Sequence, residues 1–121
     1  KIEAEQALET AQEAAEEEPA LEETGDQFQR TRRRIGAEAL QRLHAAKVLV
    51  FGVGGVGGYV CEALVRAGVG QIDIVDKDVV DITNLNRQII ATHDTIGQPK
   101  VEVCAARMRS INPKVKVKAM Q

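Results

Sequence analysis

A glycine-rich loop is the feature of this chain with the clearest chemical meaning. It joins an apolar stretch at residues 47–51 to a helical pattern at residues 56–68. Glycine has no Cβ, so the backbone of such a loop can turn tightly and approach an anion closely. The helix that follows directs unpaired N–H groups and the positive end of its dipole at the same place. This order predicts a nucleotide phosphate site, and its expected glycines are Gly52, Gly54, Gly55 and Gly57.

The glycine spacing fits two kinds of nucleotide. Gly52, Gly54 and Gly57 satisfy the dinucleotide pattern G-x-G-x-x-G. Asp76 follows the next apolar stretch, and a carboxylate there can accept hydrogen bonds from the two ribose hydroxyls of an adenosine. Both an NAD site and an ATP site agree with these residues, and a third interpretation is that the glycines serve only tight helix–strand packing.

The segment after Asp76 favours ATP over NAD. It contains Asn84, Arg87, Gln88 and, further on, Lys100. Arginine offers phosphate oxygens a planar fork of donors, and lysine offers a compact charge. We therefore expect Arg87 and Lys100 to clamp the phosphates of ATP, with Asn84 and Gln88 on its polar atoms. Stabilising charge on the α-phosphate and on pyrophosphate is what adenylation of a carboxylate requires. The alternative for each cation is a surface ion pair.

The elements that would position these residues alternate along the chain. Three segments are predicted strands: residues 47–51, 71–75 and 115–119, the last near a sheet edge. Four are predicted helices: residues 31–45, 56–68 (ended by Gly68 or Gly70), a short one at 84–90, and 99–111. The first strand is apolar after its first residue, which is typical of a parallel strand covered on both faces.

This order of elements predicts the α/β class, with a Rossmann-like parallel sheet and flanking helices. We expect right-handed crossovers. Three strands make a thin sheet, so we expect the chain to be the N-terminal half of a larger doubly wound domain. The first residue is Lys, and we expect the start to be processed or truncated.

The charge is distributed unevenly along the 121 residues. Residues 1–26 carry ten acidic residues and one lysine, a net charge of −9, whereas residues 27–121 carry fifteen basic and eight acidic residues, a net charge of +7. We interpret residues 1–25 as an acidic extension, disordered or a frayed helix, without a catalytic role. Residues 26–121 are the predicted folded part. Its basic surface either attracts phosphate-rich partners such as nucleotides and RNA or is simply a solvated face.

Cysteine usage and hydropathy suggest a reducing compartment. Cys61 and Cys104 lie on predicted helices without a paired spacing, so we expect buried small side chains rather than a disulfide, a metal site or a nucleophile. No apolar run approaches the roughly 20 residues of a membrane span, and no stretch resembles a secretory signal. We expect a cytoplasmic protein without a membrane partner.

The run from Val48 to Pro113 resembles the adenylating domain of the ubiquitin-activating-enzyme superfamily, of the ThiF, MoeB and HesA type. The matched strings are Gly52-Val53-Gly54-Gly55-Val56-Gly57, Asp76-Lys77-Asp78, Thr83-Asn84-Leu85-Asn86-Arg87-Gln88, Gly97-Gln98-Pro99-Lys100 and Ile111-Asn112-Pro113. The resemblance implies that Asp76 binds ribose. It also implies that Asn84, Arg87, Gln88 and Lys100 surround the phosphates of ATP, and it adds Asp78 to the nucleotide site. Mg²⁺ is an implied cofactor, although we expect no residue of this chain to be a metal ligand.

The segment before the first strand resembles one branch of this superfamily, the tRNA threonylcarbamoyladenosine dehydratases. The resemblance rests on Phe28-Gln29-Arg30-Thr31, Ile35-Gly36 and Ala39-Leu40. It implies ATP-dependent activation of the threonylcarbamoyl carboxylate of N6-threonylcarbamoyladenosine in tRNA, followed by dehydration to the cyclic form. It further implies a homodimer in which Arg30, or alternatively Arg33, reaches the partner subunit's ATP site as a catalytic residue beside Arg87 and Lys100.

Three other functions remain open at this point. The first is an adenylyltransferase for a ubiquitin-like sulfur-carrier protein of the molybdopterin or thiamine pathway, which would make a carrier or sulfur-transfer protein the partner. The second is an NAD-dependent oxidoreductase, and the third is an inactive nucleotide-binding fragment. The arginines at 30 and 32–34 and the basic body favour tRNA. We expect the 121 residues alone to be inactive.

Overall fold

A computed structural model describes residue 6 and residues 26–121 of the chain, which divides into two compact units, Lys1–Gln41 and Arg42–Gln121. The predicted acidic extension, residues 1–25, lies outside the described residues except for Gln6. The domain division after residue 25 therefore stays a prediction. No helix among the residues described here is both long and apolar enough to cross a membrane.

The basic segment before the first strand forms two helices where the sequence predicted one. Helix α2 covers Gln29–Ile35 and helix α3 covers Ala37–Ala45. The prediction of a single helix over 31–45 is wrong because Gly36 takes a φ of 87°, a left-handed value that glycine adopts easily. Asp26 holds the start of α2, since its carboxylate accepts hydrogen bonds from the Phe28 N–H and from Arg32 Nη1, each at 2.9 Å.

A parallel three-stranded sheet forms the centre of the second unit, which confirms the predicted fold class. Its strands are β1 (Lys47–Phe51), β2 (Gln71–Val75) and β3 (Ala119–Met120), in the order β1-β2-β3. The third strand is shorter and later than the predicted 115–119. The segment before it still pairs with β2, because the Lys116 and Lys118 carbonyls accept hydrogen bonds from the N–H groups of Ile72 and Ile74 at 2.9 Å.

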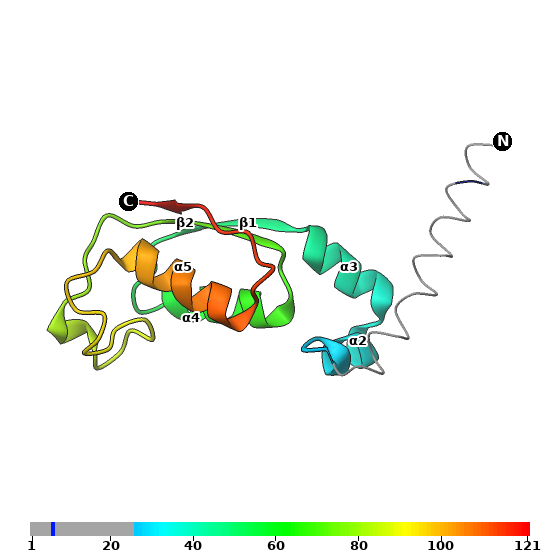
Figure 1. The fold of residues 1–121 in the computed structure, drawn as a ribbon, viewed down its shortest axis with the longest axis horizontal. Coiled ribbons are helices and arrows are strands. Elements are labelled where there is room, and N and C mark those ends of the chain that lie inside the picture. The colour runs from blue at the N-terminus through cyan, green and yellow to red at the C-terminus, as the bar shows by residue number, and fades with distance from the viewer. Residues whose placement is uncertain (1–5, 7–25) are drawn as a thin grey trace. The chain divides into compact units, whose positions relative to one another are not determined.

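Helices α4 (Gly57–Ala67) and α5 (Lys100–Ile111) lie side by side against one face of this sheet (Figure 1). Helix α4 ends at Gly68, one of the two predicted stops, with a φ of 107°. The predicted short helix at 84–90 is wrong: the chain forms a single 3-10 turn, η1, over Ile82–Asn84, and turns follow it. The turn begins earlier in the chain than the sequence pattern indicated, because the side chain of Asp81 caps its start.

The core lies between the sheet and the two helices and is aliphatic. Its fully buried members include Ile72, Ile74, Val53, Val65, Val101, Met108, Cys61 and Cys104. Burying each large aliphatic side chain contributes roughly 1.5–3 kcal/mol relative to leaving it in water. This core fixes α4 and α5 on the sheet and so fixes the positions of their first residues.

The opposite face of β1 is open to solvent in the described part of the second unit. Leu49 is 51% exposed and Phe51 is 76% exposed, whereas Val50 between them is buried. The expectation that β1 is covered on both faces is therefore wrong for these residues. The reason is that α4 and α5 both pack on the face that carries Val50, and side chains alternate between the two faces of a strand.

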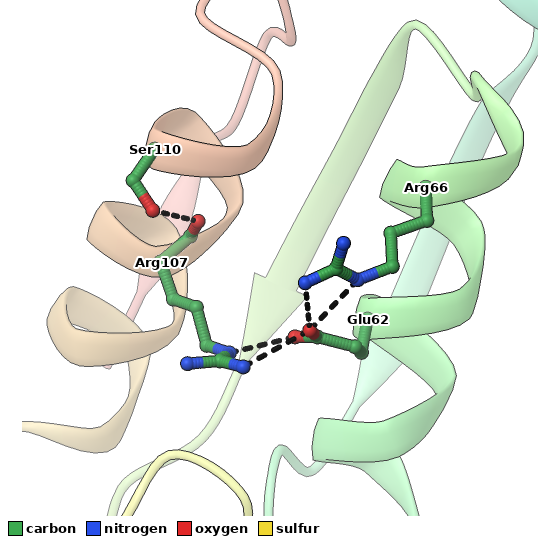
Figure 2. A network of polar contacts seen from close by, with 4 residues as sticks. All are labelled: Glu62, Arg66, Arg107 and Ser110. Atoms are coloured by element: carbon green, nitrogen blue, oxygen red, sulfur yellow. Dashed lines mark hydrogen bonds and ion pairs between the residues drawn. The ribbon is translucent and has the colours of Figure 1, made fainter. Parts of the chain in front are cut away.

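An ion-pair network joins α4 to α5 at the surface (Figure 2). The Glu62 carboxylate accepts hydrogen bonds from Arg107 Nε at 2.7 Å, from Arg107 Nη2 at 3.0 Å and from Arg66 Nε at 3.0 Å. Arg66 lies on the same helix as Glu62, whereas Arg107 comes from α5. The hydrogen bond from Arg107 is the main reason that the pKa of the Glu62 carboxyl is lowered, and burial, the next-largest effect, opposes it.

We expect Glu62→Gln to destabilise the protein by about 1 kcal/mol at neutral pH, because it removes a two-pronged charged contact that is only partly screened. The folded pKa of Glu62 lies below the unfolded value of about 4.3. Its contribution to stability is therefore complete above that unfolded value and disappears as the pH falls through the folded pKa. Urea unfolding at pH 7 and pH 3 measures this: the variant should be less stable than the parent at pH 7, and the difference should be smaller at pH 3.

Two arginine variants serve as matched controls. Arg107→Gln should lose nearly as much stability as Glu62→Gln, since it breaks the link between the helices. Arg66→Gln removes only an exposed contact within α4 and should cost less than about 0.5 kcal/mol. Equal losses in the two arginine variants would contradict a stabilising link between α4 and α5.

Candidate nucleotide-binding site

The glycine loop connects the end of β1 to the start of α4. The Gly52 N–H donates to the Val75 carbonyl at 2.7 Å, which extends the pairing with β2 into the loop. Gly52 then takes a φ of 84°. A Cβ on Gly57 would lie 1.6 Å from the Gly52 carbonyl oxygen, so no side chain fits there. These two glycines are required by the turn itself.

The middle of the loop presents free hydrogen-bond donors. Within the residues that the structure describes, the N–H groups of Gly54, Gly55 and Val56 have no acceptor. Helix α4 begins directly after them, without a side-chain cap. A Cβ on Gly55 would meet no atom within 4 Å, so the space beside it is open. Consecutive free N–H groups at a helix N-terminus suit a phosphate.

The Asp76 carboxylate ties the loop to the end of β2. Its Oδ2 accepts from the Val53 N–H at 2.9 Å, and its Oδ1 accepts from the Asp78 N–H at 2.8 Å. Sequence reasoning missed the bond from Val53, which joins positions 23 residues apart and leaves no local signal. A carboxylate oxygen can accept more than one hydrogen bond, so Asp76 keeps capacity for a further donor.

Gln88 lies over the glycine loop, although it is distant from it in sequence. Its Nε2 would be 3.4 Å from a Cβ on Gly54, so a Cβ at position 54 would be in van der Waals contact with this amide. The Gln88 side chain is buried, and its Oε1 has no hydrogen-bond partner among the described residues. A buried acceptor without a partner is costly, and such atoms commonly mark the place of a water or a ligand.

Asn84 is buried in the turn that carries Gln88. Its Oδ1 accepts from the Asp81 N–H at 2.8 Å, while Asp81 Oδ2 accepts from the Thr83 N–H at 2.9 Å. The Asn84 carbonyl also accepts from the Gln88 N–H at 2.9 Å. The side-chain oxygen of Asn84 therefore stabilises the turn, and its predicted contact with a nucleotide is a separate role that stays a prediction.

Asp81 is a positioning residue that the sequence prediction missed. The signal was present, since Asp81 and Asn84 have the spacing of a capping box. Hydrogen bonds from the Thr83 hydroxyl and backbone N–H lower the pKa of the Asp81 carboxyl, because both favour its ionised form. Asp81 thus holds the turn that places Gln88 over the loop.

We expect Asp81→Ala to weaken ATP binding about fivefold, because the turn loses its side-chain cap and frays. Isothermal titration of ATP into the purified variant measures the change. Asp81→Asn keeps an oxygen acceptor and should bind nearly as tightly as the parent. Unchanged affinity in Asp81→Ala would show that the turn does not position the site.

Arg87 and Lys100 differ in their surroundings. Arg87 is exposed, and its Nη1 donates to the Thr83 carbonyl at 3.0 Å and to Asn86 Oδ1 at 2.9 Å. These bonds orient the guanidinium and leave further donors available. Lys100 is the first residue of α5 and is only 6% exposed.

The Lys100 ammonium is only partly compensated. Its Nζ lies 4.0 Å from Asp78 Oδ2, at the limit of an ion pair, and its backbone N–H donates to the Asp78 carbonyl at 3.0 Å. A cation at a helix N-terminus opposes the helix dipole, and burial removes it from water. Such an ammonium gains from an anionic ligand, and this is the feature of the site that points most strongly to a phosphate.

Arg30 and Arg33 lie on α2 in the first unit, and both are exposed. The glycine loop and the turn that carries Gln88 belong to the second unit. Their neighbour Arg32 forms the ion pair with Asp26 instead. The predicted catalytic role of Arg30 or Arg33 stays a prediction. Among the described residues, no group of three or more His, Cys, Asp or Glu side chains could hold a metal ion.

These features define an α/β domain with a parallel sheet, a glycine loop at the end of β1 and a carboxylate at the end of β2. The chain belongs to the ThiF family, whose model matches residues 28–121. The family resemblance inferred from the sequence motifs is thus confirmed.

Several proteins of known name or structure are similar to this chain. The tRNA threonylcarbamoyladenosine dehydratase of Bacillus subtilis is 53% identical over 95 residues, which cover 78% of this chain and 37% of that protein. The sulfur carrier protein adenylyltransferase of Thermus thermophilus is 42% identical over 85 residues, covering 70% of this chain and 31% of that one. The crystal structure of the Escherichia coli tRNA N6-threonylcarbamoyladenosine dehydratase in complex with ATP is 47% identical, with a TM-score of 0.75, covering 76% of this chain and 38% of that chain. The chain therefore spans about a third of the length of these relatives.

Proposed function

We propose that this chain forms the ATP-binding part of an enzyme that adenylates a carboxylate. The carboxylate would be the threonylcarbamoyl group of N6-threonylcarbamoyladenosine in tRNA, and dehydration to the cyclic form would follow. The observation that carries the proposal is the buried, incompletely paired ammonium of Lys100, together with the free N–H groups of the glycine loop. The dehydratases of Bacillus subtilis and Escherichia coli support the choice of substrate.

In this proposal ATP lies across the carboxyl ends of β1 and β2. The remaining acceptor capacity of Asp76 receives the ribose hydroxyls, and the N–H groups of Gly54, Gly55 and Val56 donate to phosphate oxygens. Arg87 and Lys100 neutralise the charge that develops on the phosphates. A carboxylate oxygen of the substrate attacks the α-phosphorus, the bond from that phosphorus to the bridging oxygen breaks, and pyrophosphate leaves. The product is an acyl-adenylate.

The unpartnered Oε1 of Gln88 gives this amide a role in the proposal. Oε1 is an acceptor, so it would receive a donor such as a nucleotide hydroxyl or a bound water rather than a bare phosphate oxygen. Asn84 would act mainly by holding the turn. The ATP complex of the Escherichia coli enzyme supports ATP over NAD as the ligand of this site.

Mg²⁺ fits the site only as an ion that is bound mainly by the phosphates of ATP. Asp78 offers an exposed carboxylate beside the Lys100 ammonium, and Mg²⁺ typically takes one or two carboxylates together with substrate phosphates. When bound, the ion would supply additional positive charge on the phosphates.

We also propose a cytoplasmic homodimer, in which Arg30 or Arg33 reaches the partner subunit's site, since both arginines are exposed on α2.

One assay separates the leading substrate from the second candidate. AMP formation from ATP is measured with bulk tRNA, and separately with a carrier protein that ends in Gly-Gly. We expect AMP with tRNA that carries threonylcarbamoyladenosine and none with tRNA that lacks it. The second candidate, adenylation of a sulfur-carrier protein, is favoured by the Thermus thermophilus relative and would give AMP only with the carrier. That outcome would overturn the tRNA assignment.

A further inference from the structure

The guanidinium of Arg87 is held at one end by two acceptors of its own turn. Its Nη1 donates to the Thr83 carbonyl oxygen at 3.0 Å and to Asn86 Oδ1 at 2.9 Å. A terminal guanidinium nitrogen carries two hydrogens, so these two bonds use both donors of Nη1. Because a guanidinium only donates, the amide of Asn86 must present its oxygen to Arg87 and not its nitrogen.

These two bonds decide which edge of the guanidinium is open to a ligand. An arginine can bind an anion with two parallel N–H groups from its end, through Nη1 and Nη2, or from its side, through Nε and Nη2. The end edge is closed here, because both hydrogens of Nη1 are already donated. Within the described part of the chain, Nε and Nη2 have no acceptor. The side edge therefore keeps its two donors.

The two acceptors have different supports. Asp81 Oδ2 accepts from the Thr83 N–H at 2.9 Å and from the Thr83 hydroxyl, so the cap of the turn holds Thr83 and its carbonyl. The side chain of Asn86 is exposed, and its bond from Arg87 is the one hydrogen bond that this amide makes among the described residues. A single acceptor would let the planar guanidinium rotate about the N–H axis. Asn86 supplies the second acceptor, which fixes that rotation.

We propose that Asn86 is a positioning residue for Arg87, which occupies Nη1 and so presents the edge formed by Nε and Nη2 to the phosphates. The inference rests on the proposed function, in which Arg87 neutralises charge on the leaving pyrophosphate. A donor fork that is oriented before the reaction needs no reorganisation while this charge develops. Asn86 does not have to touch the nucleotide, since it acts through Arg87.

Replacing Asn86 should therefore affect turnover more than ATP binding. Asn86→Ala should lower kcat of ATP–pyrophosphate exchange about tenfold, because a rotating guanidinium is often misplaced when pyrophosphate leaves. The KM for ATP should change less than about twofold, since the charge of Arg87 stays on the turn. Asn86→Asp keeps an oxygen at the same position but adds a negative charge, so its kcat should lie between those of Asn86→Ala and the parent. The urea unfolding midpoints should match the parent, because Asn86 is exposed.

A double-mutant cycle in the full-length protein, with its carboxylate substrate present, tests whether Asn86 acts through Arg87. In the Arg87→Ala background, Asn86→Ala should change exchange by less than about twofold. Arg109→Ala is the matched background, since Arg109 lies on α5 and donates to the Val117 carbonyl. There, Asn86→Ala should still lower exchange about tenfold. A crystal structure with a non-hydrolysable ATP analogue should show Nε and Nη2 of Arg87 on phosphate oxygens.

Three outcomes would overturn the proposal. Parent-like exchange in Asn86→Ala would show that Asn86 does not position Arg87. A loss that persists in the Arg87→Ala background would show that Asn86 acts on the nucleotide directly or through the turn. Phosphate oxygens bound to Nη1 would exclude the assigned edge. Failure of the proposed function looks different, since the parent would then show no exchange, or Arg87→Ala alone would exchange at the parent rate.

Discussion

Replacing Arg87 by alanine should lower ATP–pyrophosphate exchange at least about a hundredfold, the scale expected for one lost charge contact in a transition state. Arg87 is exposed, and its two hydrogen bonds end on its own turn, at Thr83 and Asn86. The Arg87→Ala variant should therefore keep the fold, but the leaving pyrophosphate would lose the hydrogen bonds and the charge of the guanidinium. Exchange is measured in the full-length protein with its carboxylate substrate present.

Two further variants show whether the effect belongs to the phosphate site. Arg87→Lys keeps the charge and loses the fork, so it should retain part of the activity. Arg109→Ala removes another exposed arginine, one on α5 that donates to the Val117 carbonyl, and should exchange at the parent rate. Exchange that survives in Arg87→Ala would refute the assignment of Arg87, and equal losses in Arg87→Ala and Arg109→Ala would indicate a general charge effect.

Replacing Gly57 by alanine should abolish ATP binding, with a loss of more than about a hundredfold in affinity. The added Cβ would lie 1.6 Å from the Gly52 carbonyl oxygen, so the loop between β1 and α4 cannot keep its path. We expect the free energy of unfolding to fall by roughly 3 kcal/mol or more, the scale of severe overpacking. Urea unfolding and calorimetric titration of ATP measure the two effects.

Gly55→Ala is the matched control in the same loop. A Cβ there would meet no atom within 4 Å, and Gly55 does not need a positive φ. The stability of this variant should equal that of the parent. Its ATP affinity should nevertheless fall at least about tenfold, because the methyl group would enter the space assigned to the phosphates. A Gly55→Ala protein that binds ATP normally would show that this space does not hold the nucleotide.

The parts of the fold that follow from local chemistry could be predicted from the sequence. The apolar stretches of β1 and β2, the glycine loop between β1 and α4, and the stop of α4 at Gly68 each depend on residues adjacent in the chain. The same is true of the end of α5 before Pro113. These signals were enough to predict the α/β class and the position of the glycine loop.

The errors came from features that local patterns do not determine. The apolar periodicity continued through Gly36, so it hid the break between α2 and α3. A continuous apolar run in β1 could not tell which of its faces the helices cover. Side-chain hydrogen bonds of Asp81 and Asn84 stabilise a turn in place of an α-helix. The apolar periodicity over 84–90 carries no information about these bonds, so it predicted a helix.

The candidate site shows the same division. The residue types and spacings were enough to select a set of candidate site residues, because phosphate chemistry requires glycines and cations, and their contacts with a nucleotide stay a prediction. The contact of Gln88 with the loop at Gly54 and the bond from Val53 to Asp76 depend on tertiary packing. So does the burial of Lys100, since long charged side chains are rarely buried unless paired.

Crystals of the protein soaked separately with a non-hydrolysable ATP analogue and with NAD test the central claim most directly. The account predicts that the triphosphate lies on the N–H groups of Gly54, Gly55 and Val56, with Lys100 and Arg87 on its oxygens, and that NAD leaves the site empty. A structure with the pyrophosphate of NAD in the loop, and with both cations directed into water, would contradict it.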